Sequence, residues 1–340
     1  MKKSFVTILI AILSISIGVY SQSDADASKL FRTSSVQKPD FSKIDNYVLG
    51  LKIGKNVSEK EMVELIIKKS TTNLEKARAI FVWIADNIAY DTSFKVTTFE
   101  EGLAKRKGVC QAYSELFKRF GELAGLQVVV ISGDSNQYDY KKPSDLDSGG
   151  HAWNAFKSDN GKWILVDATW GAGYVKNRKF TKEFTDFWFN PSPEIYIFSH
   201  FPKDDKWQLI DKQISKDAFL KMPPITPKFE NWGFDSKELL NHFLNSKHSG
   251  FPDFYSIDLD WKIVKMPVSA ELKKGTTYEF IFEMPQQEEI AIFLNDTPFF
   301  AEKKGNKHTI IFKPDKKGNA LITIKQKNGQ FAGVLSYEVK

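Results

Sequence analysis

The sequence has very little cysteine: its 340 residues contain one, Cys110. A single cysteine cannot form an internal disulfide, so the fold must be held by its packed core, and Cys110 is left as a free thiol. A cysteine is often only a small buried apolar side chain, so the residues around Cys110 must decide whether its thiol is reactive.

The sequence also lacks long runs of one charge and any spacing typical of a metal site. Its 48 Lys and Arg are scattered among 42 Asp and Glu, for a net charge of +6. This pattern fits a solvated surface better than a nucleic-acid surface, so we expect no nucleic-acid partner. Asp145 and Asp147 lack the loop pattern of an EF-hand, and we expect neither metal nor cofactor.

Long hydrophobic runs are scarce as well. An apolar run at residues 5–20 follows Lys2 and Lys3, but it is short for a membrane-spanning helix and is diluted by Ser and Thr. The pattern favours a secretory signal peptide, residues 1–21, over an N-terminal membrane anchor. We therefore expect an exported protein, periplasmic or extracellular, with no stable membrane insertion once the signal is removed.

What is present suffices for two packed domains, because 42% of the residues are apolar and 14% are aromatic. Short alternating runs after residue 253, separated by turn residues, predict a small β-sandwich with immunoglobulin-like strand spacing. The predicted organisation is a signal peptide at 1–21, an N-terminal extension at 22–60, a core at 61–222, a linker with a connecting helix at 223–253 and the sandwich at 254–340.

The predicted core mixes helical and strand patterns, which indicates an α+β fold. Thr72 and Glu75 form a capping box ahead of an apolar helical stripe. A second, buried helix is expected to begin at Cys110 and to end near Gly125. The β-branched segment at 126–132 then predicts a central strand.

A hairpin follows, with strands predicted at 151–156 and 162–170 around turn residues 159–161. Cys110 and this hairpin carry the chemistry that we expect. A thiol at a helix N-terminus is favoured as a thiolate by the helix dipole, and Gly108 would let the backbone turn sharply into the helix.

His151 and Asp167 are the candidate base and its orienting carboxylate, provided that they share one face of the hairpin. Side chains alternate along a strand, so the loop length decides this. A two-residue turn would put His151 and Asp167 on opposite faces. A three-residue loop pairs Ser158 with Lys162, puts both side chains on one face and requires Gly161 in a left-handed conformation.

Three sequence blocks, GVCQAYS, HAWNAF and WILVDATWGAGY, resemble the transglutaminase-like superfamily, and the segment EIYIFSHFPKDDKWQLI resembles its kyphoscoliosis-peptidase branch. The resemblance implies a papain-like or transglutaminase-like core, in which a helix-borne cysteine packs on an antiparallel sheet carrying histidine and aspartate. It implies that Cys110 is the nucleophile, His151 the general base and acid, and Asp167 the residue that orients the imidazole. His200, in the same branch-like segment, is expected to be structural.

The oxyanion hole is less well defined. The Cys110 backbone amide is one donor, but the glutamine that papain-like proteases carry six residues upstream is Ala104 here. The remaining candidates, each of which has an alternative role in the core, are Tyr90 and Gln111 for the oxyanion hole or cleft, and Trp153 and Trp170 for the substrate groove.

These residues predict a thiol-dependent acyl-transfer enzyme acting on peptide or protein amide bonds. With water as the acyl acceptor the enzyme is a cysteine peptidase or amidase, which the kyphoscoliosis-peptidase likeness favours. With an amine as acceptor the same residues would cross-link proteins as a transglutaminase does. A non-catalytic scaffold or binding protein is the third reading, and the intact Cys, His and Asp speak against it.

Overall fold

The computed structural model describes residues 30–31, 39–54, 57–136, 150–223, 225–245, 250–255, 261–285 and 288–340. The chain divides into a core unit, Leu30–Gly250 with Trp261–Val264, and a C-terminal unit that includes Phe251–Asp260 and Lys265–Lys340. The predicted signal peptide and the residues Asp145 and Asp147 lie outside the described residues. In the described part of the chain, no helix is long and apolar enough to cross a membrane.

The helices that open the core unit pack around one long buried helix, α4 (Asn73–Asn87). The predicted capping box is confirmed, because the Thr72 hydroxyl accepts from the Glu75 amide and the Glu75 carboxylate accepts from the Thr72 amide. Trp83 of α4 lies 5.5 Å from Phe120 of α6, ring centre to ring centre. The other helices here are α2 (Ser42–Leu49), α3 (Glu59–Ile66), α5 (Phe99–Lys105) and α6 (Cys110–Leu123).

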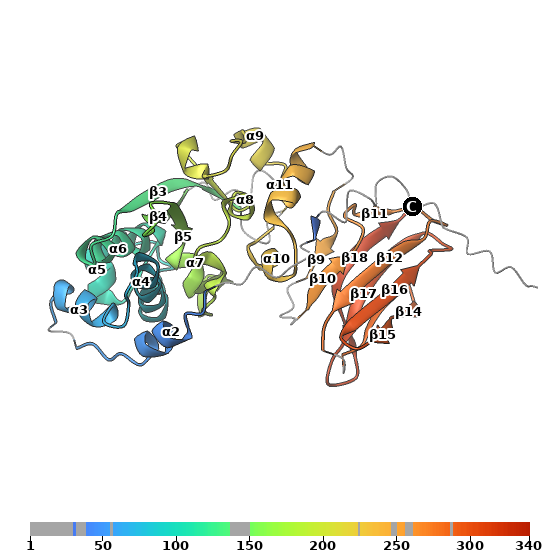
Figure 1. Cartoon of the computed structure of the whole chain (residues 1–340), viewed down its shortest axis with the longest axis horizontal. Coiled ribbons are helices and arrows are strands. Elements are labelled where there is room, and N and C mark those ends of the chain that lie inside the picture. The colour runs from blue at the N-terminus through green and yellow to red at the C-terminus, as the bar shows by residue number, and fades with distance from the viewer. Residues whose placement is uncertain are drawn as a thin grey trace, which may run out of the picture. The chain divides into compact units, whose positions relative to one another are not determined.

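An antiparallel sheet in the order β5-β4-β3-β8 lies against α6 (Figure 1). Its strands are β3 (Val128–Ser135), β4 (His151–Lys157), β5 (Trp163–Val166) and β8 (His200–Pro202). Strand β4 is buried on both faces: Phe156 packs into the cluster with α4 and α6, while Trp153 packs into a second cluster on the opposite side. A central strand with two buried faces explains its nearly continuous apolar sequence.

The hairpin register agrees with the three-residue loop. Lys157 pairs with Trp163, and the Ser158 amide donates to the Lys162 carbonyl at 2.9 Å. Gly161 has φ +81°, the left-handed conformation that the loop requires. The predicted second strand is too long, however: β5 ends at Val166, and the chain then turns into the short helix α7 (Ala168–Ala172).

The remaining core-unit elements are short, and some of them lie in the predicted linker. One of them, α11, is the helix of the predicted linker, and it belongs to the core unit. The elements are β1 (Ala89–Tyr90), β2 (Lys107–Gly108), β6 (Gly173–Lys176), β7 (Lys179–Lys182), η3 (Asp186–Trp188), α8 (Pro193–Tyr196), η4 (Asp205–Gln208), α9 (Lys216–Phe219), α10 (Lys228–Asn231) and α11 (Ser236–Asn245).

The C-terminal unit is a two-sheet β-sandwich. One sheet has the order β11-β18-β17-β13-β14, and β12, β16 and β15 pair in the other. Phe280 of β12 lies 5.6 Å from Tyr337 of β18, so the buried faces of the two sheets meet. The strands are β9 (Asp253–Phe254), β11 (Glu271–Leu272), β12 (Tyr278–Glu283), β13 (Ile290–Leu294), β14 (Thr297–Phe300), β15 (Glu302–Lys304), β16 (Lys307–Phe312), β17 (Gly318–Lys325) and β18 (Phe331–Val339). Strand β10 (Lys262–Lys265) crosses the boundary between the units, because its residues up to Val264 belong to the core unit.

Candidate active site

Cys110 is the first residue of α6, as the sequence predicts, and its side chain is half-buried. The N-cap residue Val109 offers no side-chain hydrogen bond to the first turn of the helix. A glycine is needed at position 108 for a different reason than we expected, because Gly108 does not adopt a positive φ. A Cβ at Gly108 would lie 2.6 Å from the Cβ of Ala112, so the glycine is needed for close packing between β2 and α6.

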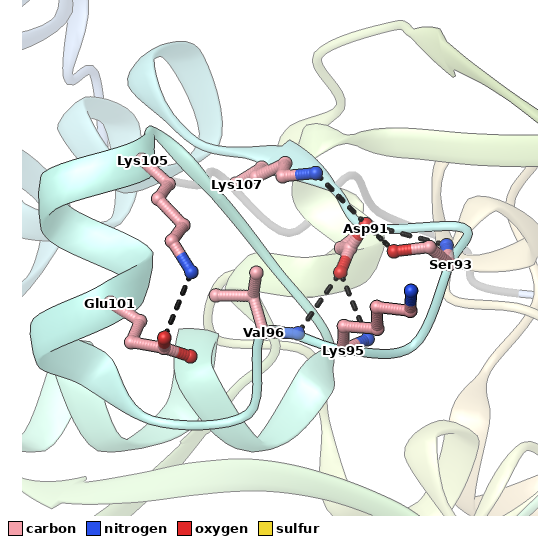
Figure 2. Close-up of polar contacts among 7 residues, drawn as sticks. All are labelled: Asp91, Ser93, Lys95, Val96, Glu101, Lys105 and Lys107. Carbon is pink, nitrogen blue, oxygen red and sulfur yellow. Dashed lines mark hydrogen bonds and ion pairs between the residues drawn. The ribbon is translucent and has the colours of Figure 1, made fainter.

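A loop built on Asp91 fixes the start of α6 (Figure 2). The buried Asp91 carboxylate accepts hydrogen bonds from the amides of Lys95 and Val96, both at 3.0 Å. The Val96 carbonyl in turn accepts from the Val109 amide at 2.9 Å, and the Asp91 amide donates to the Gly108 carbonyl at 2.9 Å. Gly108 and Val109, the two residues before Cys110, are therefore tied to the loop that Asp91 organises.

The same carboxylate also accepts from the Ser93 hydroxyl at 2.7 Å and pairs with Lys107 at 3.4 Å (Figure 2). Burial would raise the pKa of Asp91, but the hydrogen bonds from Ser93, Val96 and Lys95 hold that pKa well below its usual range. Asp91 therefore stays ionised at any ordinary pH. Sequence analysis missed this residue, although a chain reversal with Asp followed two residues later by Ser is a recognisable turn signal.

His151, at the start of β4, and Asp167, directly after β5, meet in the interior. The Nε2 atom of His151 lies 2.7 Å from Oδ2 of Asp167. Nε2 faces the carboxylate, so Nδ1 is the ring nitrogen that remains for Cys110, whose interaction with His151 contributes to the raised pKa of that histidine. His151 and Asp167 are therefore in direct contact, and Cys110 interacts with the same imidazole.

Asp167 is fully buried and serves as the N-cap of α7. Its Oδ1 accepts from the Thr169 amide at 2.8 Å and the Trp170 amide at 3.1 Å. Burial would raise the pKa of Asp167, but the charge and hydrogen bond of His151, with a further hydrogen bond from His200, hold it well below its usual range. The helix that replaced the predicted strand end thus supplies two of the donors that keep this carboxylate ionised.

The imidazole of His151 is set up to carry a proton. Burial alone would lower its pKa, but the charge and hydrogen bond of Asp167 and the hydrogen bond with Cys110 raise the pKa of His151 from 6.5 to about 10.

A second histidine, His200 on β8, also contacts Asp167: its Nε2 lies 3.2 Å from Oδ2. His151, Asp167 and His200 form a group of potential metal ligands, whose ligand atoms all lie within 4.8 Å of one another. These atoms are already engaged in hydrogen bonds with each other, so an ion could enter only by breaking the contacts that hold His151.

The four weaker candidates for the cleft and the groove differ in their exposure and in their contacts. Trp153 is 1% exposed, so it cannot wall an open groove, and the groove reading is wrong for this residue. Trp170 is half-buried and its ring lies 5.3 Å from that of His151. Tyr90 is also half-buried and lies edge-on to the exposed Phe94. The Gln111 amide nitrogen donates to Glu115 at 2.6 Å, so its donor group is engaged on its own helix.

A thiol on the first turn of a helix, packed against an antiparallel sheet that carries the histidine, is the arrangement of a papain-like or transglutaminase-like core. Residues 60–168 match the model of the transglutaminase-like superfamily. This part of the chain is accordingly a transglutaminase-like core of the kyphoscoliosis-peptidase-like branch.

Two curated relatives show how far the likeness extends. The chain is 32% identical over 235 residues to the kyphoscoliosis peptidase of Homo sapiens, an alignment covering 66% of this chain and 33% of that protein. It is 26% identical over 212 residues to Hillarin of Drosophila melanogaster, covering 57% of this chain and 26% of that protein. The alignments therefore span about a third or less of these relatives' own length.

Among solved structures, the periplasmic domain of TgpA from Pseudomonas aeruginosa has a TM-score of 0.29 and 19% identity to this chain. The match covers 41% of this chain and 50% of that one.

Proposed function

We propose that this protein is an exported, thiol-dependent acyl-transfer enzyme that acts on peptide or protein amide bonds, with Cys110, His151 and Asp167 as its catalytic triad. The observation that carries the proposal is the contact between the buried His151 and Asp167, together with the interaction of the half-buried Cys110 with the same imidazole. A scaffold has no need of a buried imidazolium beside a half-exposed thiol, because such a pair costs desolvation without adding a binding surface.

In the first half of the reaction, the Cys110 thiolate attacks the amide carbonyl carbon. The C–S bond forms while the carbonyl π electrons move to oxygen, and the backbone N–H of Cys110 is placed to donate to that oxyanion. When the tetrahedral intermediate collapses, the C–N bond breaks and Nδ1 of His151 gives its proton to the leaving amine. The product is an acyl thioester on Cys110 and a neutral His151.

In the second half, an acceptor attacks the thioester and gives its proton to Nδ1 of His151, and the Cys110 thiolate leaves. We propose water as the acceptor, which makes the protein a cysteine peptidase or amidase. The name of the human relative, kyphoscoliosis peptidase, supports this choice. An amine acceptor, giving a cross-linking transglutaminase, uses the same residues and remains the second candidate because of the superfamily match.

Thiol labelling tests the proposal without a known substrate. Iodoacetamide is added from about pH 4 to about pH 9, a range that brackets the unperturbed pKa values of His and Cys. We expect rapid alkylation of Cys110 well below pH ~8.5, the unperturbed thiol pKa. We expect the low-pH reactivity to disappear in His151→Ala and to persist in His308→Ala, which alters a buried histidine of the C-terminal unit.

A thiol that is unreactive in the folded protein, or equally reactive in the wild type and His151→Ala, would contradict the enzyme proposal. A non-catalytic scaffold would then be the remaining interpretation. Water and amine acceptors are then separated by incubating the protein with casein and a fluorescent primary amine. New amino termini would indicate hydrolysis, whereas fluorescence bound to casein would indicate amine transfer, and in each case Cys110→Ala should abolish the signal.

A further inference from the structure

We propose that His200 is a positioning residue: as a neutral Nε2–H donor it holds the Asp167 carboxylate in the orientation that Asp167 needs to support His151. The inference rests on the proposed function and deepens it. Its first support is that the lone pairs of Asp167 are fully used. Oδ1 accepts two backbone amides of α7, and Oδ2 accepts the Nε2 atoms of His151 and His200.

The second support is that the tautomer of His200 is set by its neighbours. Its Nδ1 lies 2.8 Å from the Ser199 hydroxyl. That hydroxyl also lies 3.0 Å from the Tyr196 carbonyl, so its single proton has two possible acceptors. If the hydroxyl donated to the carbonyl instead, Nδ1 would carry the proton and the bare Nε2 would face a carboxylate. The arrangement without repulsion has Ser199 donating to Nδ1 and Nε2–H donating to Asp167.

The third support is that His200 is held neutral. It is buried among aromatic rings: Tyr196 stacks on it at 4.0 Å, and Trp170 and Trp153 lie at 4.5 and 5.0 Å between ring centres. Burial lowers the pKa of His200 to about 4, and the charge of nearby His151 acts in the same direction, while Asp167 acts against both. One carboxylate thus faces two histidines, of which only His151 carries charge.

The roles of the two histidines differ because their other ring nitrogens face different groups. Nδ1 of His151 faces the thiol, whereas Nδ1 of His200 faces a hydroxyl that cannot titrate in this range. His200 therefore moves no proton in the reaction. Its contribution is to keep Oδ2 of Asp167 pointed at Nε2 of His151. Without the hydrogen bond from His200, the carboxylate could rotate or bind a proton, and its contact with His151 would weaken.

The pH profile of Cys110 alkylation tests this inference. His200→Phe fills the aromatic pocket but lacks the hydrogen-bond donor. We expect the acid limb of its profile, the pH range in which the alkylation rate rises from its low-pH value, to move upward by about one pH unit. This is the size of one lost hydrogen bond to a charged group. His200→Gln, whose Nε2 can still donate to Asp167, should recover most of that shift. His308→Phe is the matched control, because His308 is also fully buried and its nitrogens contact only two backbone carbonyls.

Three outcomes are informative. An acid limb in His200→Phe identical to that of the wild type overturns the inference while leaving the proposed function intact. An unreactive wild-type thiol defeats the proposed function itself. If His200→Phe does not fold, Ser199→Ala decides, because it keeps the imidazole but removes the group that sets the tautomer. We then expect a smaller upward shift, and an unchanged profile in Ser199→Ala would count against the inference.

Discussion

At the scale of single residues, the site depends on how a few buried polar atoms are shared. Asp167 is fully buried, and its charge is stabilised by two amides and two histidines instead of water. A buried carboxylate without such donors would protonate, and His151 would then lose the charge that raises its pKa. The geometry around Asp167 therefore controls the protonation state of a nitrogen on the far side of the imidazole.

The raised pKa of His151 predicts how stability depends on pH. A group that binds its proton more tightly in the folded state stabilises that state fully below its unfolded pKa, and the stabilisation is lost as pH rises through the folded pKa. For His151 the window lies between 6.5 and about 10. We expect the free energy of unfolding, measured by urea titration, to fall across this window in the wild type and to fall less in His151→Gln.

Asp167→Asn should also reduce the fall in the free energy of unfolding with pH, because it removes the charge that raises the His151 pKa. Lys and Tyr side chains titrate near the top of the window in all three proteins, so the comparison is made as a difference from the wild type. Equal slopes in the wild type and both variants would mean that His151 is not protonated in the folded state at neutral pH.

At the scale of elements, the start of α6 is fixed by contacts that cross the chain. The Asp91 loop binds Val109 through Val96, and Gly108 allows β2 to pack against Ala112 of the helix. A shift of the first helical turn would move the half-buried sulfur relative to His151, so the proposed reaction depends on these contacts.

Gly108 and Ala112 provide a test of that packing. In Gly108→Ala the new Cβ would lie 2.6 Å from the Cβ of Ala112. We expect the free energy of unfolding to fall by about 1–3 kcal/mol, the usual cost of overpacking, and Cys110 alkylation to slow. Removing the opposing methyl group should relieve the clash, so Gly108→Ala with Ala112→Gly is expected to be more stable than the sum of the single effects.

A double-mutant cycle, with thermal or urea unfolding and alkylation rates measured on all four proteins, gives the coupling directly. Strictly additive effects would show that the two positions do not interact, and that the approach between β2 and α6 is not what fixes the nucleophile.

How much of these elements the sequence could predict depends on the range of the contacts involved. Local signals identified the capping box at Thr72 and the helix start at Cys110. The hairpin register is predicted from the condition that His151 and Asp167 share a face, and the pairing of Lys157 with Trp163 agrees with it. The second strand of the hairpin ends at Val166, four residues before its predicted end at Trp170, because the Asp167 side chain caps α7 instead. No local pattern indicates that His200 contacts Asp167, since this requires β8 to pair with β3 across the sheet.

At the scale of the whole molecule, the site belongs entirely to the core unit. Cys110, His151, Asp167 and His200 all lie between residues 30 and 250, and the C-terminal sandwich has buried residues of its own. Two compact units with separate cores need not unfold in one step. A substitution in either core should therefore act first on the unit that contains it.

Two buried phenylalanines test this independence. Phe117 of α6 packs on Phe156, and Phe280 of β12 packs on Tyr337; both are 0% exposed. Calorimetry of the wild type should show two thermal transitions. Each Phe→Ala change should destabilise its own unit by about 3–5 kcal/mol, enough to lower one transition by several degrees. Phe280→Ala should leave the alkylation rate of Cys110 unchanged at low temperature, whereas a single transition lowered by both variants would show that the two units unfold as one.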